Sequence, residues 1–215
     1  MSSYPSALSG SRRSVSADRS PPAVSSGFQL FAYLDASNIW LAGSQVSAAR
    51  RGMAHSAKSA AENRIIDPGF RITFKGLRQF AVGEDTTRAA RTVCVGSSKA
   101  NSDGAIWKTA EHAGWEAMTP QRAKSGREKE VDTTLSVVLL EDLLCSRANP
   151  HEVDVTLFSG DRDLLPAVKA LRRHGYAVDI ACWDHATSAE LKLAARRFIA
   201  LDEYFDLLSY QPQNH

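Results

Sequence analysis

The sequence predicts an α/β protein built on an open, doubly wound and mostly parallel β-sheet. Short runs rich in β-branched and aromatic residues alternate with longer stretches of helical periodicity, which is the pattern of βαβ units. The runs at 28–34 and 153–159 are apolar almost throughout, as is typical of parallel strands covered by helices on both faces. Right-handed crossovers between such units place helices on either side of the sheet.

The expected elements follow from this pattern in chain order. Strands are expected at 28–34, 91–95, 116–119, 153–159 and 176–183, and helices at 68 to about 80, 102 to about 112, 128–144, 165–174 and 188–198. Gly175 suits the position just beyond a helix end, and Ser188 suits an N-cap. The Ala- and Ser-rich stretch 44–63 has few large apolar side chains, so we expect an insertion there, either a weak helix or a mobile loop.

The composition indicates one folded domain between two tails. Of the 215 residues 43% are hydrophobic, which is enough for a sizeable core. Residues 1–26 are rich in Ser, Pro and Arg with little apolar content, so a disordered tail is expected there. The domain is expected over 27–208, with a C-terminal tail at 209–215.

The charge of the chain argues against a strong non-specific nucleic-acid binder. The formal net charge is +2, and the tail alone accounts for it, because Arg12, Arg13 and Arg19 are opposed there only by Asp18. The remainder is therefore neutral, without the basic surface that such binders carry. A nucleic-acid partner would have to be held locally or through a metal ion.

Other composition signals exclude further classes. There is neither a signal-peptide core nor an apolar run of roughly 20 residues that could span a membrane, so a cytoplasmic protein without a membrane partner is expected. Cys94, Cys145 and Cys182 lie in apolar segments without CxxC spacing, which favours buried free thiols. The six histidines are scattered, which argues against a structural zinc site.

Acidic residues follow two of the expected strands at the point where each strand ends. Asp35 comes directly after the first strand, and Asp161 and Asp163 follow the strand at 153–159. Ligands of doubly wound sheets bind at the carboxyl ends of the strands, near the point where the strand order reverses. If these two strands are neighbours, we expect the three carboxylates to converge.

A fourth acid, Asp132, is expected to join them from a helix. It lies three, seven and eleven residues before Leu135, Leu139 and Leu143, which places it on the same helix face as the apolar stripe. A merely solvated acid would lie on the opposite face. Asp132 is therefore predicted to extend the buried stripe at the first turn of the helix, near the strand ends.

Converging carboxylates repel one another unless protons or cations neutralise them. Hard oxygen ligands suit Mg²⁺ or Mn²⁺, which can activate a water for attack on a phosphodiester. Each acid also has a plainer interpretation. Asp35 and Asp161 or Asp163 could be helix caps or turn residues, and Asp132 could be a favourable first-turn charge.

The same residues resemble the NYN group of PIN-like nucleases, including LabA-like bacterial proteins. The matching segments are YLDASNIW, KEVDTTL and LFSGDRDLLPAVKALRRHGYAVDI, and the segment SAELKLAARRFIALDEY is similar to the family's closing helix and strand. The resemblance covers about residues 28–205. The SGDxD motif followed by LxPxV is its most specific part, whereas DxxN after the first strand is weak alone.

This resemblance implies a Rossmann-like PIN fold and Mg²⁺- or Mn²⁺-dependent cleavage of RNA, with DNA left open as a substrate. It implies that Asp35, Asp132, Asp161 and Asp163 bind metal and carry catalysis. Asn38 and Ser159 match accessory positions that could orient water or phosphate. Two departures are Arg196-Arg197, where family members often have an acid before the closing Phe, and the longer stretch 44–63.

Several neighbours of the acids are candidate substrate contacts. Lys129 ends a basic stretch just before Asp132, and Arg162 lies between Asp161 and Asp163; both could contact phosphate, although a solvated loop explains the basic stretch equally well. Trp40 could stack on a base or pack at the rim, while the other three tryptophans, Trp107, Trp115 and Trp183, are interpreted as core.

Rival families fit the motifs less well. A haloacid-dehalogenase phosphatase needs DxDx[TV] after the first strand, an integrin-type metal site needs DxSxS, and a Toprim domain needs an early Glu; the chain has DASNI. The serious alternative is a non-catalytic RNA- or protein-binding member of the same fold. Self-association is left open.

Overall fold

The computed structural model describes residues 29–97, 104–119, 129–145 and 149–210 of the chain. Its centre is a 6-stranded sheet in the order β4-β3-β1-β5-β6-β7, in which all neighbouring strands are parallel. The strands are β1 (Gln29–Asp35), β3 (Ala89–Val95), β4 (Glu116–Met118), β5 (Val153–Phe158), β6 (Val178–Cys182) and β7 (Arg197–Ala200). A small antiparallel pair joins β2 (Arg71–Ile72) to β8 (Ser209–Tyr210). The predicted α/β fold class with a mostly parallel, doubly wound sheet is therefore confirmed.

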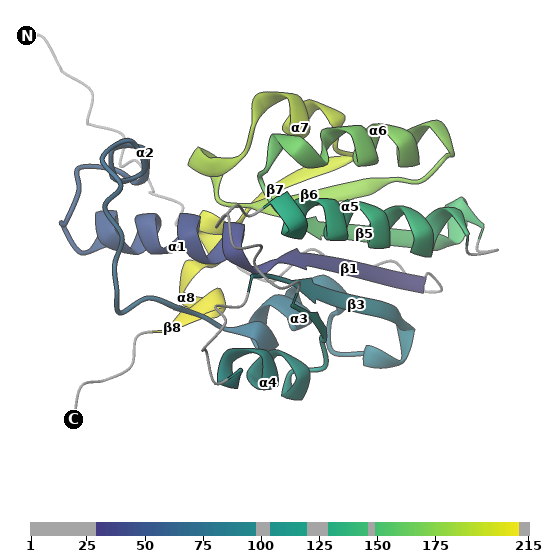
Figure 1. Ribbon diagram of the computed structural model, residues 1–215, viewed down its shortest axis with the longest axis horizontal. Helices are drawn as coiled ribbons and strands as arrows, with labels where there is room; N and C mark the ends of the chain where they lie inside the picture. Colours follow the sequence, from purple (N-terminus) through teal and green to yellow (C-terminus); the bar gives the residue numbers. More distant parts are fainter. Residues whose placement is uncertain (1–28, 98–103, 120–128, 146–148, 211–215) are drawn as a thin grey trace, which may run out of the picture.

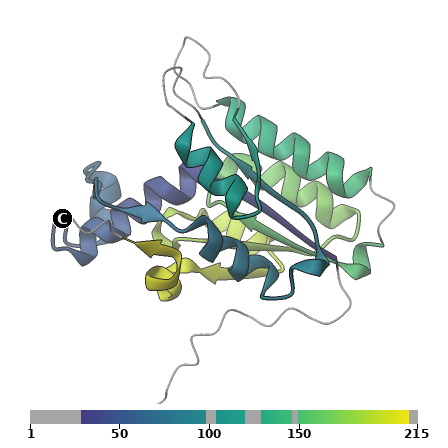
Figure 2. The same ribbon diagram turned by 90° about the horizontal axis from the view of Figure 1, so that it is seen from below.

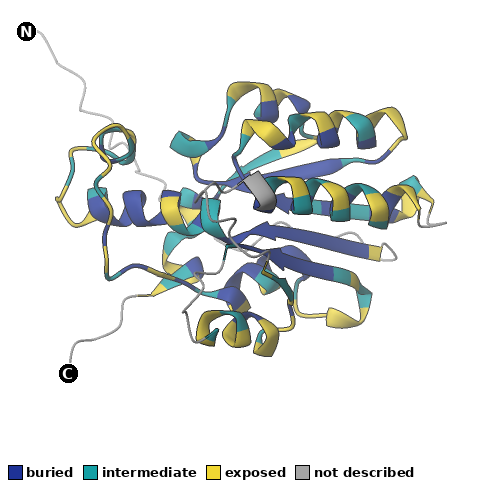
Figure 3. Ribbon diagram, in the orientation of Figure 1, coloured by how far each residue is buried: buried dark blue, intermediate teal, exposed yellow. Residues whose placement is uncertain are grey.

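Helices cover both faces of this sheet (Figures 1 and 2). They are α1 (Ala36–Arg50), α2 (Ala57–Glu62), α3 (Phe74–Val82), α4 (Ala105–His112), α5 (Lys129–Leu144), α6 (Leu165–Arg173), α7 (Ala189–Ala194) and α8 (Phe205–Leu208). In Figure 2, α5 in green lies on one side of the strands and α3 in blue lies on the other. Alternate side chains of β1 lie on the two faces of the sheet. Leu30, Ala32 and Leu34 pack with α1 and α3, whereas Phe31 and Tyr33 pack with α5. The central strands are buried along most of their length (Figure 3).

The position of β1 in the sheet determines where a site can form. Because β3 and β4 lie on one side of β1, and β5, β6 and β7 on the other, the order reverses between β1 and β5. Their register runs from Gln29 opposite Val153 to Leu34 opposite Phe158, so both strands end at the same edge. The predicted adjacency of these two strands is confirmed.

The stretch 44–63, expected as an insertion with either a weak helix or a mobile loop, contains the end of α1 and the whole of α2. Residues up to Arg50 belong to α1, the helix that follows β1 directly, and the residues from Ser44 to Ala48 are buried. A Cβ at Gly43 would lie 2.5 Å from the Phe70 ring and 2.9 Å from the Trp183 ring. Small residues are needed on this helix because two aromatic rings pack against its backbone, so its core face lacks the large apolar side chains that sequence periodicity detects.

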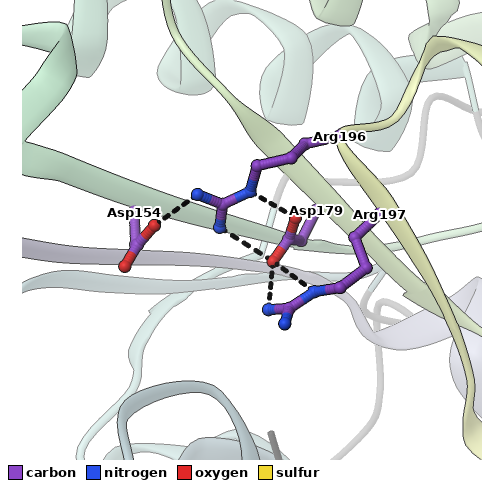
Figure 4. Close-up of polar contacts among 4 residues, drawn as sticks. All are labelled: Asp154, Asp179, Arg196 and Arg197. Atoms are coloured by element: carbon purple, nitrogen blue, oxygen red, sulfur yellow. Dashed lines mark hydrogen bonds and ion pairs between the residues drawn. The ribbon is translucent and has the colours of Figure 1, made fainter. Parts of the chain in front are cut away.

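The prediction of a helix over 188–198 was too long. Ser188 is the N-cap as expected, but α7 ends at Ala194, and Arg197–Ala200 form the edge strand β7. Arg196 and Arg197 both bind the carboxylate of Asp179, which is 2% exposed, and Arg196 also binds Asp154 (Figure 4). Asp154 and Asp179 lie near the amino ends of β5 and β6, so the two arginines bind at the opposite edge of the sheet from the acids that follow β1 and β5.

Several smaller expectations have definite outcomes. Cys94 and Cys182 are buried free thiols as predicted, whereas Cys145 is exposed. Gly175 follows α6 with a φ of 88°, as expected for a residue beyond a helix end. Ser209 and Tyr210, assigned to the C-terminal tail, form β8. The expected tail at 1–26 lies outside the described residues. No helix in the described part of the chain is long and apolar enough to cross a membrane.

Candidate functional site

The carboxyl ends of β1 and β5 border a cavity of about 450 Å³. Three of the four predicted acids line it, namely Asp35, Asp132 and Asp161. They come from the end of β1, the first turn of α5 and the loop after β5. In the sequence, Asp132 lies 97 positions after Asp35 and 29 positions before Asp161. The fold therefore brings together acids that are distant along the chain.

Asp35 is the most buried of these acids, with 2% of its surface exposed. Its Oδ1 accepts a hydrogen bond from the Asn38 backbone N–H at 3.0 Å, which caps α1. Its Oδ2 accepts a hydrogen bond from the Ser159 hydroxyl at 3.2 Å. The capping interpretation of Asp35 is thus correct, and the same carboxylate also lines the cavity.

The surroundings of Asp35 oppose its ionisation. The pKa of Asp35 is raised from 3.8 to about 7, because burial and the charges of Asp132 and Asp161 together outweigh the hydrogen bonds from Asn38 and Ser159 that lower it. The electrostatic influence of both acids shows that they lie near Asp35. A cation in this cavity would favour the ionised form of the carboxylate.

The loop after β5 holds Asp161 in place. Its Oδ1 accepts a hydrogen bond from the Asp163 N–H at 2.9 Å, and its own N–H donates to the Ser159 hydroxyl at 3.2 Å. A Cβ at Gly160 would lie 2.3 Å from the Ala186 carbonyl oxygen, so only glycine fits at this turn. Asp163 is exposed and is not among the described residues that line the cavity; its role as a metal ligand stays a prediction.

Asp132 lies at the start of α5, where the buried stripe of that helix meets the cavity. Leu135, Leu139 and Leu143 are all fully buried against the sheet, as the sequence predicted. Asp132 is half-buried and borders the cavity together with the neighbouring Val131. The stripe therefore fixes the face of the helix from which this acid reaches the site.

Asn38 and Ser159 connect the two loops that carry the acids. The Asn38 Oδ1 accepts a hydrogen bond from the Gly160 N–H at 3.0 Å, which joins α1 to the loop after β5. Ser159 is fully buried, and its hydroxyl contacts both Asp35 and the Asp161 N–H. These contacts make both residues supports for the acids; Asn38 also lines the cavity, where it could contact a substrate.

The two predicted cationic contacts differ in what the structure shows. Arg162 is exposed and pairs with Glu190 at 3.1 Å, so it lies on the surface beside the acid loop. Lys129 opens α5, but its side chain lies outside the described residues. Phosphate binding by either residue stays a prediction.

Apart from Trp40, sequence reasoning missed the residues of the other wall of the cavity, which is apolar and aromatic. It comprises Trp40, Leu41, Ile72, Phe74, Ile106 and Trp107. Trp107, interpreted as core, is partly exposed there, whereas Trp115 and Trp183 are buried as predicted. The sequence signal for the position of Trp107 is Gly96, the residue directly after β3. A glycine is needed there because a Cβ would lie 2.3 Å from the Trp107 ring.

The carboxylate oxygens of Asp35, Asp132 and Asp161 are chemically suited to bind a hard divalent cation. Carboxylate oxygens are the ligands that Mg²⁺ and Mn²⁺ prefer, and each carboxylate oxygen can accept more than the hydrogen bond already made. Among the described residues, no three His, Cys, Asp or Glu side chains lie close enough together to hold a metal ion as they stand. The three acids thus share a cavity without forming a tight cluster.

A Rossmann-like parallel sheet with acids at its carboxyl edge is the PIN-like α/β arrangement. The model of the NYN domain matches residues 45–202, so the chain belongs to the NYN domain family, a family of PIN-like nucleases. The match begins after β1, and the Asp35 and Asn38 positions lie outside it.

Comparison with solved structures supports the fold. The chain is similar to a protein of unknown function from Vibrio parahaemolyticus RIMD 2210633, with a TM-score of 0.57, 16% sequence identity, and coverage of 87% of this chain and 100% of the other. At this identity the likeness concerns the fold alone. No curated protein matches the chain.

Proposed function

We propose that this protein is a ribonuclease that hydrolyses RNA phosphodiester bonds with the help of Mg²⁺ or Mn²⁺. The observation that carries the proposal is the meeting of Asp35, Asp132 and Asp161 at one cavity on the switch point of the sheet. Membership of a family of PIN-like nucleases supports it.

The arrangement assigns a role to each acid. Asp35, Asp132 and Asp161 would hold the cation, which would polarise the phosphodiester and make a bound water more acidic. Asp35 and Asp161 are fixed by hydrogen bonds from Asn38, Ser159 and Asp163, so little reorganisation is needed there when the substrate binds. Asp163, two residues after Asp161 in the same loop, is proposed as a further metal-binding acid.

Electrostatics explains why the acids would need a cation before they could bind RNA. Like charges at about 4 Å repel by several kcal/mol at an effective dielectric constant near 20. The phosphate backbone adds further negative charge, and the chain has no large net positive charge to offset it. RNA binding at the acids is therefore expected to depend on the divalent ion.

The test is incubation of purified protein with labelled RNA and DNA in Mn²⁺, Mg²⁺ or EDTA. We expect RNA cleavage with either metal and none in EDTA, and we expect Asp35→Asn, Asp132→Asn and Asp161→Asn each to abolish it. Asp85→Asn is the matched control, since Asp85 is exposed and precedes β3 at the opposite edge of the sheet. Wild-type protein that binds RNA but never cleaves it would overturn the proposal in favour of a non-catalytic RNA-binding protein.

A further inference from the structure

The aromatic wall of the cavity has features that the proposed chemistry does not use. Trp40 and Trp107 line the cavity beside Asp35, and both are only partly buried. Trp40 lies on α1 and Trp107 on α4, so two separate helices contribute an indole to the same space. Ile106 and Leu41 flank them and are 49% and 46% exposed.

The two indoles differ from the tryptophans that stabilise the core. Trp115 donates its indole N–H to the Phe74 carbonyl, and Trp183 donates to the Ile39 carbonyl; both rings also pack edge-on against phenylalanines. Within the described residues, neither Trp40 nor Trp107 has a hydrogen-bond partner for its N–H or a ring contact with another aromatic side chain. The N–H group of a buried tryptophan normally finds a partner, so within the described part of the chain both indoles line the cavity with an N–H that no protein group accepts.

The backbone fixes the place of Trp107 relative to the acids. Its ring packs on Gly96, directly after β3, and Ala36 lies beside the same position. Asp35 pairs with Val95 in the register of β1 and β3. The indole therefore lies over the end of the strand next to the one that carries Asp35, and it lines the same cavity as the acids.

We propose that Trp40 and Trp107 form a base-binding subsite, in which an unpaired nucleobase stacks while its phosphate lies at the acids. This inference rests on the proposed function, since it assigns the substrate's phosphate to the acidic wall. The cavity of about 450 Å³ lies within the range of roughly 300–1,000 Å³ for small-ligand sites. A base in a duplex cannot enter such a cavity, because its faces are covered by its neighbours.

The test measures affinity separately from cleavage. On the Asp161→Asn background in excess Mn²⁺, where cleavage is expected to be abolished, fluorescence anisotropy compares two probes of about eight nucleotides, a length that a single-strand binding site accommodates. One is oligoadenylate, and the other is an abasic oligomer with the same number of phosphates. Base–aromatic stacking contributes about 1–3 kcal/mol per base, so Trp107→Ala and Trp40→Ala should each weaken oligoadenylate binding roughly 5- to 150-fold.

Controls separate stacking from misfolding. Trp107→Phe should restore most of the affinity, and Leu193→Ala, at a leucine 82% exposed on α7, should leave it unchanged. The abasic probe should bind all variants equally weakly. Equal binding of oligoadenylate by the Trp→Ala variants and the background, or an equal loss for both probes, would overturn the subsite. If the stacking pattern holds but wild-type protein cleaves no RNA, the base subsite stands and the ribonuclease proposal fails.

Discussion

Replacing Asp35 by Asn should stabilise the metal-free protein at neutral and alkaline pH. The Asp35 carboxyl is 2% exposed, and burial together with the charges of Asp132 and Asp161 raises its pKa from 3.8 to about 7. Since each pH unit between the folded and unfolded pKa corresponds to 1.36 kcal/mol, the ionised carboxylate costs the fold up to about 4 kcal/mol. Asn fits the same contacts, because its carbonyl oxygen can accept from the Asn38 N–H and its amide can donate to the Ser159 oxygen.

The sign of the pH dependence follows from the raised pKa of Asp35. Below pH 3.8 the carboxyl is protonated in both states and costs nothing. Between pH 3.8 and about 7 the unfolded chain releases the proton while the folded protein retains it, so this group's contribution to stability falls with rising pH, and above pH 7 the full cost applies. The Asn variant lacks this cost at every pH, so its advantage should grow from pH 4 to pH 8.

The assay is urea unfolding in EDTA at pH 5 and pH 8 for wild type and Asp35→Asn. At pH 8 we expect the variant to gain about 2–4 kcal/mol in unfolding free energy, the upper figure being the full cost of the buried charge. Asp163→Asn, a change of the same chemistry at an exposed position of the neighbouring loop, should show no such gain. An Asp35→Asn variant that is less stable than wild type at pH 8, or whose advantage does not change with pH, would refute the reasoning.

Two further predictions concern the support of the site and of the sheet edge. Gly160→Ala should cost about 1–3 kcal/mol by overpacking, because the new Cβ would lie 2.3 Å from the Ala186 carbonyl oxygen; chemical denaturation measures the loss, and unchanged stability would show that the loop can move. Replacing Arg196 and Arg197 together by Met should cost on the order of 3 kcal/mol, since it leaves the buried Asp179 carboxylate unpaired. Adding Asp179→Asn to that variant should recover much of the loss, and an absence of recovery would contradict this pairing.

The parts of the fold that the sequence predicted depend on local patterns. The apolar runs of β1 and β5 identify central parallel strands, and the acids directly after them identify the edge where a site forms. Asp132 could be assigned because Leu135, Leu139 and Leu143 define the buried face of its helix. These inferences need only the periodicity of each element and the handedness of its connections.

The parts that escaped prediction depend on contacts between distant segments. The small residues of α1 are buried because Phe70 and Trp183 pack against Gly43, and a stretch of Ala and Ser contains no sign of those partners. Trp107 borders the cavity because its ring packs on Gly96, at the end of another element. Tertiary packing of this kind has no local periodicity, so one sequence cannot show it.

The most direct test of the central claim is a Mn²⁺ titration followed by calorimetry on wild-type protein and on Asp35→Asn, Asp132→Asn and Asp161→Asn. If these acids hold the ion, wild type should bind Mn²⁺, each of the three variants should lose at least tenfold in affinity, and the exposed control Asp85→Asn should bind as wild type does. Mn²⁺ affinity that is the same in wild type and all three cavity variants would contradict the account.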